Sequence, residues 1–199
     1  MAYAELDITT NFTFLTGASH PAELAAQAKI LGLTTIGVAD RNTLSGIVRA
    51  YAAAKEIGQD LRVGARLVLR SETTLLCYPK TLTGYSALSQ LLTLGKRRAP
   101  KGECHLDLSD VIERLLDCIL ILIDPVFAQS DIAALKTAFG ADLYLGLSVR
   151  YDGWDAQRFA SIADLANTRY IPLVSLGGVL MHSAGRRKLA DVLSCIRLA

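Results

Sequence analysis

Polar and charged side chains stand at the ends of several predicted strands. In parallel α/β folds the working residues lie where strands end and loops begin. The residues at these positions are Asp7 with Thr9, Asp40 with Arg41 and Asn42, Arg66, Asp124, Arg150 with Asp152, and Gly177 with Gly178. Carboxylates gathered at one edge of a sheet can hold metal ions for hydrolysis, but such a site needs several histidine and carboxylate ligands together.

Histidine and cysteine are too sparse to complete such a cluster. The chain has three histidines, His20, His105 and His182, and each is expected to be a surface or helix-capping residue. Its four cysteines form no CxxC pair and have no histidine at zinc spacing. Reduced thiols in a cytoplasmic protein are therefore expected.

Two basic clusters stand out from a chain whose net charge is only +2. The first comprises Lys96, Arg97, Arg98 and Lys101 in a predicted loop over residues 94–106. It can neutralise DNA phosphates, or it can be a solvated loop that complements the negative end of the preceding helix.

The second cluster lies at the start of the last predicted helix, where positive charge is unfavourable. It comprises Arg186, Arg187 and Lys188. This placement favours an outside partner such as phosphate, DNA or an acidic surface.

Hydrophobic periodicity alternates between strands and helices. Strands are predicted over residues 3–9, 34–39, 62–69, 73–78, 118–123, 142–149 and 171–176. The first helix is predicted from His20 and Pro21 to Gly32, and the second over residues 43–58. The adjacent strands around Ser71 and Glu72 indicate a hairpin, and the whole pattern favours an irregular α/β barrel of about seven strands with outer helices.

Apolar residues spaced along one face of each predicted helix are expected to form the core. The stripes are Leu24, Ala28 and Leu31; Tyr85, Leu88 and Leu92; Phe159, Ile162, Ala163 and Ala166; and Leu189, Val192, Leu193 and Ile196.

Length and composition indicate a single globular domain. The chain has 199 residues, is 51% hydrophobic and has a mean hydropathy of +0.32. No apolar run reaches the roughly 18 residues that a membrane-spanning helix needs, and the N-terminus lacks the pattern of a signal peptide. A cytoplasmic protein with no membrane partner is expected.

Residues 4–58 begin with AELDITTNFTFLTGASHPAEL and end with AYAAAKEIG, and this stretch resembles the opening of a known domain. It is similar to the polymerase and histidinol phosphatase (PHP) domain at the N-terminus of bacterial C-family DNA polymerases, whose members resemble the DNA polymerase III alpha subunit. The segments LVLR, TTLLCYPKTLTGYSALSQLLTLGKRRAPKGECHLDLSDV and RRKLADVLSCIRLA extend the likeness to the error-prone branch.

The chain departs from the metal-binding pattern of that family. The family's ligand positions fall on Asp7, Thr9, Thr16, Asp40, Arg41, Arg66, Gly178 and Leu180. Only Asp40 keeps a family ligand, while Arg41 and Arg66 stand where a histidine and a glutamate are expected. The resemblance then implies no catalytic residue and no metal cofactor in this segment, with the two arginines free to pair with Asp7 or Asp40.

The resemblance also implies where polymerase chemistry belongs. Residues 1–182 are expected to form the PHP-like barrel, and residues 183–199 a helix that leads towards the polymerase thumb and palm. Magnesium and nucleotidyl transfer would belong to a palm beyond Ala199, so this segment alone is expected to be inactive. Its expected partners are the rest of the polymerase chain, DNA through the basic loop, and accessory mutagenesis proteins acting in translesion synthesis.

Two enzymatic alternatives stay open on the sequence. One is a divergent phosphoesterase that binds magnesium through Asp7, Asp40 and Asp152, since magnesium accepts oxygen ligands alone. The other is an unrelated small-molecule α/β barrel enzyme, which would require a deep polar pocket at the strand ends.

Overall fold

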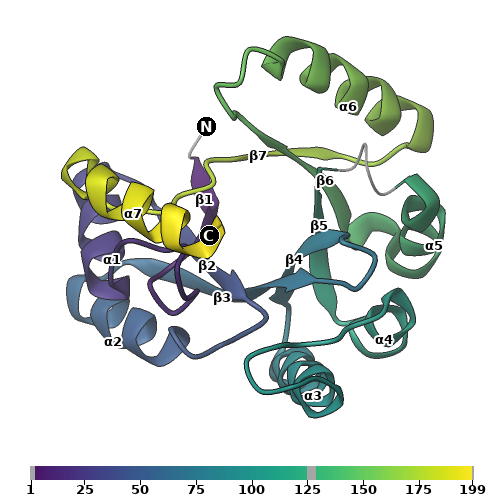
Figure 1. The fold of residues 1–199 in the computed structure, drawn as a ribbon. Helices are drawn as coiled ribbons and strands as arrows, with labels where there is room; N and C mark the ends of the chain where they lie inside the picture. The colour runs from purple at the N-terminus through teal and green to yellow at the C-terminus, as the bar shows by residue number, and fades with distance from the viewer. Residues whose placement is uncertain (1–2, 125–128, 199) are drawn as a thin grey trace. The chain divides into compact units, whose positions relative to one another are not determined.

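The computed structural model describes residues 3–124 and 129–198 (Figure 1). Met1 and Ala199, the outer limits of the expected 1–182 and 183–199 domains, lie outside the described residues. The elements run in the order β1 (Ala4–Ile8), α1 (Pro21–Ile30), β2 (Thr35–Arg41), α2 (Ile47–Ile57), β3 (Asp60–Val68), β4 (Thr74–Pro79), α3 (Leu82–Arg98), α4 (Leu108–Arg114), β5 (Cys118–Ile123), α5 (Gln129–Phe139), η2 (Gly140–Asp142), β6 (Leu143–Ser148), α6 (Asp155–Arg169), β7 (Leu173–Leu176), η3 (Ala184–Arg186) and α7 (Arg187–Leu198). The alternation of strands and helices confirms the expected α/β class.

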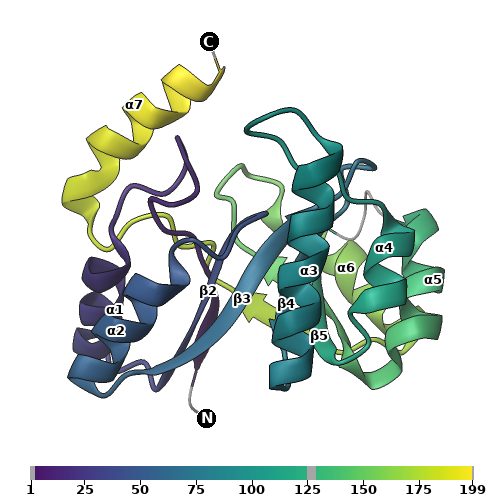
Figure 2. The ribbon, with the colours of Figure 1, turned by 90° about the horizontal axis from the view of Figure 1, so that it is seen from below.

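The chain divides into two compact units, one comprising Met1–Ala65 with Gly177–Ala199 and the other Arg66–Leu176. In the first unit β1 pairs in parallel with β2, which is followed by β3 in the sheet order. Helices α1 and α2 lie side by side in both views (Figures 1 and 2). Their buried residues and those of the strands form one apolar cluster: Ile8, Leu24, Ala25, Ala28, Ile36, Val38, Ile47 and Ala50.

The loop between β1 and α1 is tightly folded on itself. The Thr13 N–H donates to the Thr10 carbonyl at 2.9 Å, and the Gly17 N–H donates to the Thr13 carbonyl at 3.2 Å. A Cβ atom at Gly17 would lie only 2.0 Å from the Thr10 carbonyl oxygen. This contact explains why residue 17 is a glycine, because any side chain there would force the loop open.

In the second unit β4 and β5 pair antiparallel, while β5, β6 and β7 follow in parallel. The apolar strand residues Leu75, Leu120, Leu122 and Leu145 are fully buried. The expected turn around Ser71 and Glu72 is confirmed, because the Leu69 N–H donates to the Thr73 carbonyl at 2.9 Å and Glu72 has a positive φ of 64°.

The seven predicted strands are confirmed to within three residues at each end. The second helix begins at Ile47 rather than at residue 43, because Gly46 is its N-cap and Thr43 and Ser45 bond to each other through their hydroxyls. Helices α4 and α5 were not predicted individually from the sequence.

The expectation that every apolar stripe is core is wrong for α7. Leu189, Val192 and Ile196 are 40%, 55% and 55% exposed, and none of the described residues of α7 is fully buried. Leu31 on the first helix and Tyr85 on the third are also exposed. Periodicity shows that a face is apolar, but not that anything covers it.

No helix in the described part of the chain combines the length and the hydropathy that crossing a membrane would require.

The close approach at Gly17 generates a first prediction. Gly17→Ala should lower the free energy of unfolding by at least about 2 kcal/mol, because the new methyl group overlaps a backbone carbonyl that is itself hydrogen-bonded. Gly185→Ala is the matched control, since its Cβ would meet only the Ser183 Oγ at an ordinary 3.7 Å. Urea unfolding followed by circular dichroism measures both; equal stabilities for the two variants would contradict the prediction.

Candidate functional site

The backbone of the first unit brings several of the family's ligand positions together. The Thr9 N–H donates to the Val179 carbonyl at 2.9 Å, and the Val179 N–H donates to the Asp7 carbonyl at 2.8 Å. The Ala18 N–H likewise donates to the Leu180 carbonyl at 2.8 Å. The end of β1 and the segment after β7 therefore lie side by side.

Asp40, at the end of β2, is the best-held carboxylate of this region. Its Oδ1 accepts the Thr10 N–H and the Thr13 hydroxyl, and its Oδ2 accepts the Thr10 hydroxyl, each at 2.8 Å. The side chain is buried at 1% exposure, and burial raises the pKa of Asp40 while the bonds from Thr10 and Thr13 act in the opposite direction. This carboxylate is a structural tie between β2 and the loop after β1.

The expected pairing of Asp40 with Arg41 is wrong. Threonines hold the carboxylate, while the Arg41 backbone N–H donates to the Thr13 hydroxyl at 3.0 Å and its side chain is exposed. The reason is local, since successive strand residues point to opposite faces and Arg41 follows Asp40 directly. A Cβ at Gly46 would lie 2.5 Å from Asp40 Oδ2, so the start of α2 also fits closely against this carboxylate.

The donors at these positions do not fit a divalent metal. Gly178 and Leu180 offer no side-chain ligand, Thr9 and Thr16 offer hydroxyls, and Asp7 and Asp40 are the two carboxylates. Asp40 already accepts three hydrogen bonds from Thr10 and Thr13. Among residues 3–124 and 129–198, no group of three or more His, Cys, Asp or Glu side chains is placed to hold a metal ion. Zinc or manganese hydrolases need more ligands than this set supplies.

Glu5 is a buried residue that reasoning from the sequence did not single out. Its Oε1 accepts the backbone N–H groups of Asp7 at 2.8 Å and Gly177 at 3.1 Å, and its Oε2 accepts the Tyr3 hydroxyl at 2.8 Å. Burial, together with this carboxylate, raises the pKa of Tyr3. The available signal was an acidic residue inside a predicted strand, between the apolar residues Ala4 and Leu6.

The second unit holds the remaining polar strand-end residues. Arg66 lies on β3, and its expected pairing with Asp7 stays a prediction. Asp124 forms an ion pair with Arg150. Asp152 accepts the Trp154 N–H and pairs with Arg158 at 3.0 Å; these contacts lower the pKa of Asp152, led by the bond from Trp154. The contacts of Asp152 are therefore with residues of its own loop and of helix α6.

The first basic cluster is mostly helical, which corrects the predicted loop over residues 94–106. Lys96, Arg97 and Arg98 form the last turn of α3, where they complement the negative end of the helix, while Lys101 follows in the connection to α4. Arg98 pairs with Asp110 at 2.7 Å. Burial alone would raise the pKa of Asp110, but the Asp107 N–H and Arg98 outweigh it and lower this pKa.

The second basic cluster has one internal partner. Arg186 pairs with Glu23 on α1, and Glu23 also accepts the His20 N–H at 2.9 Å. Arg187 and Lys188 are exposed, and their role in binding a partner stays a prediction.

Ser19, His182 and Glu23 form no catalytic triad. Ser19 Oγ lies 2.8 Å from His182 Nδ1, and Glu23 Oε2 faces the same ring nitrogen at 3.7 Å. A triad needs the carboxylate on one ring nitrogen and the nucleophile on the other.

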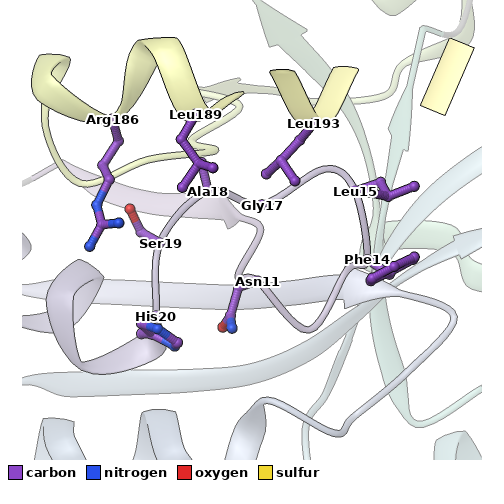
Figure 3. Close-up of a pocket in the computed structure, with 10 residues that line it drawn as sticks. All are labelled: Asn11, Phe14, Leu15, Gly17, Ala18, Ser19, His20, Arg186, Leu189 and Leu193. Carbon is purple, nitrogen blue, oxygen red and sulfur yellow. The ribbon is translucent and has the colours of Figure 1, made fainter. Parts of the chain in front are cut away.

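A pocket of about 340 Å³ opens beside this cluster in the first unit (Figure 3). Phe14 and Leu15 from the first loop and Leu189 and Leu193 from α7 line it, while Arg186 stands at one end. Its lining is mainly apolar, unlike the deep polar pocket that a small-molecule enzyme would need.

The chain belongs to the PHP domain family, whose model matches residues 5–151. It is 41% identical, over 99% of its length, to a protein named error-prone DNA polymerase from Ruegeria pomeroyi, and 42% identical, over 98%, to one of the same name from Caulobacter vibrioides. It spans only 22% and 18% of those two relatives.

Solved structures confirm the expected α/β fold of the PHP type. A protein from Bifidobacterium adolescentis assigned as a metal-dependent phosphoesterase matches 92% of this chain and 88% of its own, with a TM-score of 0.64. An amidohydrolase from Chromobacterium violaceum, with sulfate bound and no metal, matches 90% and 88%, with a TM-score of 0.66. Both are 14% identical to this chain, so the likeness concerns the fold alone.

The Asp40 contacts generate a second prediction. Asp40→Ala should lower the free energy of unfolding by about 3 kcal/mol or more, because it leaves the buried donors of Thr10 and Thr13 without an acceptor. Asp40→Asn, which keeps the size and one acceptor, should cost less. Urea unfolding compares both with Asp164→Ala at an exposed helical site, and a loss for Asp40→Ala no greater than this control would refute the structural role.

Glu23 generates a third prediction, on pH dependence. The His20 N–H, followed by Arg186 and His182, lowers the pKa of Glu23 below its ordinary 4.5 in the folded chain. A carboxyl group with a lowered folded pKa stabilises the fold above 4.5 and loses this contribution as the pH falls through the folded pKa. Wild type should therefore be more stable than Glu23→Gln at neutral pH, and the difference should shrink in acid. A stability difference that grows in acid would contradict the lowered pKa of Glu23 in the folded chain.

Proposed function

We propose that this chain is the catalytically silent PHP domain of an error-prone DNA polymerase, serving as a structural support rather than as a hydrolase. The names of its relatives support the polymerase, and the small share of each relative that it spans supports a part of a larger chain. The parent polymerase would act in translesion synthesis during the repair of DNA damage, in the cytoplasm. Nucleotidyl transfer with magnesium would belong to its palm.

The observation that carries the proposal is the state of Asp40. This carboxylate corresponds to a metal ligand in the family, yet here it accepts bonds from Thr10 and Thr13. A metal would have to displace these donors and would gain few ligands in exchange, because Gly178 and Leu180 have no coordinating side chain. The domain would then use its polar residues to fix its own backbone, and thereby to brace the thumb and palm.

The alternative is a phosphoesterase that binds magnesium through Asp7, Asp40 and Asp152. Two of these residues count against it: Asp40 already accepts three hydrogen bonds from Thr10 and Thr13, and Asp152 is paired with Arg158. This alternative is retained because a solved protein of similar fold is assigned as a metal-dependent phosphoesterase.

The surface roles proposed for the domain follow from its exposed cations. Lys96, Arg97 and Lys101 in the first cluster, and Arg187 and Lys188 in the second, are exposed and available to DNA or to accessory mutagenesis proteins. Arg98 and Arg186 would contribute less, because each already pairs with an internal carboxylate.

A metal and activity assay gives the fourth prediction. After incubation with zinc, manganese or magnesium and dialysis, the purified chain should retain less than one metal ion per molecule by elemental analysis. It should also hydrolyse neither a generic phosphoester nor single-stranded DNA. Two or more bound ions, or magnesium-dependent turnover that Asp40→Asn abolishes, would favour the phosphoesterase; turnover that survives Asp40→Asn would indicate a contaminating enzyme and leave the metal count to decide.

A further inference from the structure

A groove of about 390 Å³, lined mostly by residues with polar side chains, runs along α3 next to the end of α4 in the second unit. The two helices are neighbours in both ribbon views (Figures 1 and 2). The polar residues that line it are Ser86, Ser89, Gln90, Thr93, Arg97 and Arg114. Ser86, Gln90, Thr93 and Arg97 recur every three or four positions and follow one face of α3, and Ser89 directly precedes Gln90.

Two guanidinium groups line this groove without a direct ion pair, although Arg114 is close enough to Asp110 to lower the pKa of that carboxyl group, after the Asp107 N–H and Arg98. Within the described residues, neither Arg97 nor Arg114 forms an ion pair or a side-chain hydrogen bond. The nearby carboxylate of Asp110 is bonded to Arg98 at 2.7 Å and also accepts the Asp107 N–H. No acidic side chain lines the groove, so it carries positive charge only.

The remaining lining groups suit the oxygens of a phosphate. The serine hydroxyls and the glutamine amide are donors that commonly bind the nucleic-acid backbone, whereas the Thr93 hydroxyl already donates to the Ser89 carbonyl at 2.8 Å. Arginine presents a planar fork of N–H donors that matches two phosphate oxygens at once. Leu94 supplies one apolar contact in the same groove.

We propose that the groove between α3 and α4 binds a phosphate of a single-stranded nucleic-acid backbone, with Arg97 and Arg114 clamping its oxygens. Lys96 and Lys101 are exposed at the same end of α3 and extend the positive surface for neighbouring phosphates. A chain of phosphates fits this arrangement better than a free ion, because only a polyanion reaches both the groove and these lysines. The inference refines the nucleic-acid surface of the proposed function and adds Arg114 to it.

The fifth prediction concerns binding of a fluorescein-labelled oligothymidylate, followed by fluorescence anisotropy at several salt concentrations. Arg97→Gln combined with Arg114→Gln should weaken binding at least about tenfold at low salt and should reduce the slope of log affinity against log salt by about 1.4, since each contact with a single strand contributes about 0.7. Lys55→Gln combined with Arg169→Gln, on α2 and α6, is the control with the same loss of charge at exposed positions. Equal effects of the two double variants would overturn the proposal.

A measurement on the wild-type chain makes the test independent of the variants. The side-chain Nε–H signals of Arg97 and Arg114 in a ¹H–¹⁵N spectrum should shift and saturate with added oligonucleotide. Inorganic phosphate should shift them only at much higher concentration, and polyglutamate should not reproduce the change. Unmoved arginine signals, or polyglutamate binding as tight as that of the oligonucleotide, would refute the nucleic-acid site. Either failure leaves the metal content and the proposed support role unaffected.

Discussion

The arrangement of the first unit depends on one buried carboxylate. Asp40 is almost inaccessible to water, and a charge in that position is tolerated only when protein donors replace its hydration. Thr10 and Thr13 supply those donors from the loop after β1, and they can do so only because Gly17 and Gly46 leave room for the close approach. The ends of β1 and β2, the loop between them and the start of α2 are thus fixed by a single cluster of contacts.

A second buried carboxylate of the first unit makes contacts of the same kind. Glu5 also joins backbone segments near the start of β1, where its carboxylate accepts hydrogen bonds from the backbone N–H groups of Asp7 and Gly177. Asp40 accepts bonds from donors 27 and 30 residues away, and Glu5 accepts one from the Gly177 N–H, 172 residues away, so each acid joins separate segments. In the proposed function, these hydrogen bonds would hold the segments together without a metal.

Much of the fold followed from the sequence, because strands with β-branched residues and a helix that begins with Pro21 are local signals. The residues of the candidate site could be predicted from the sequence only in part. The family pattern located Asp7 and Asp40, but the donors to Asp40 lie 27 and 30 residues earlier, and no local rule selects Thr10 and Thr13 over the adjacent Arg41. The prediction that the apolar stripe of α7 is core fails for a related reason: periodicity describes a helix face, whereas burial depends on what other segments cover it.

The most direct test of the central claim is a manganese titration of the ¹⁵N-labelled chain. Paramagnetic manganese broadens amide signals close to where it binds, and the Thr10 amide donates directly to Asp40. If Asp40 is a structural tie and not a ligand, the amides of Asp7, Thr9 and Thr10 should broaden no more than exposed acidic segments such as that around Asp164. Selective, saturable broadening of these three amides would contradict the claim and place a metal at the end of β1.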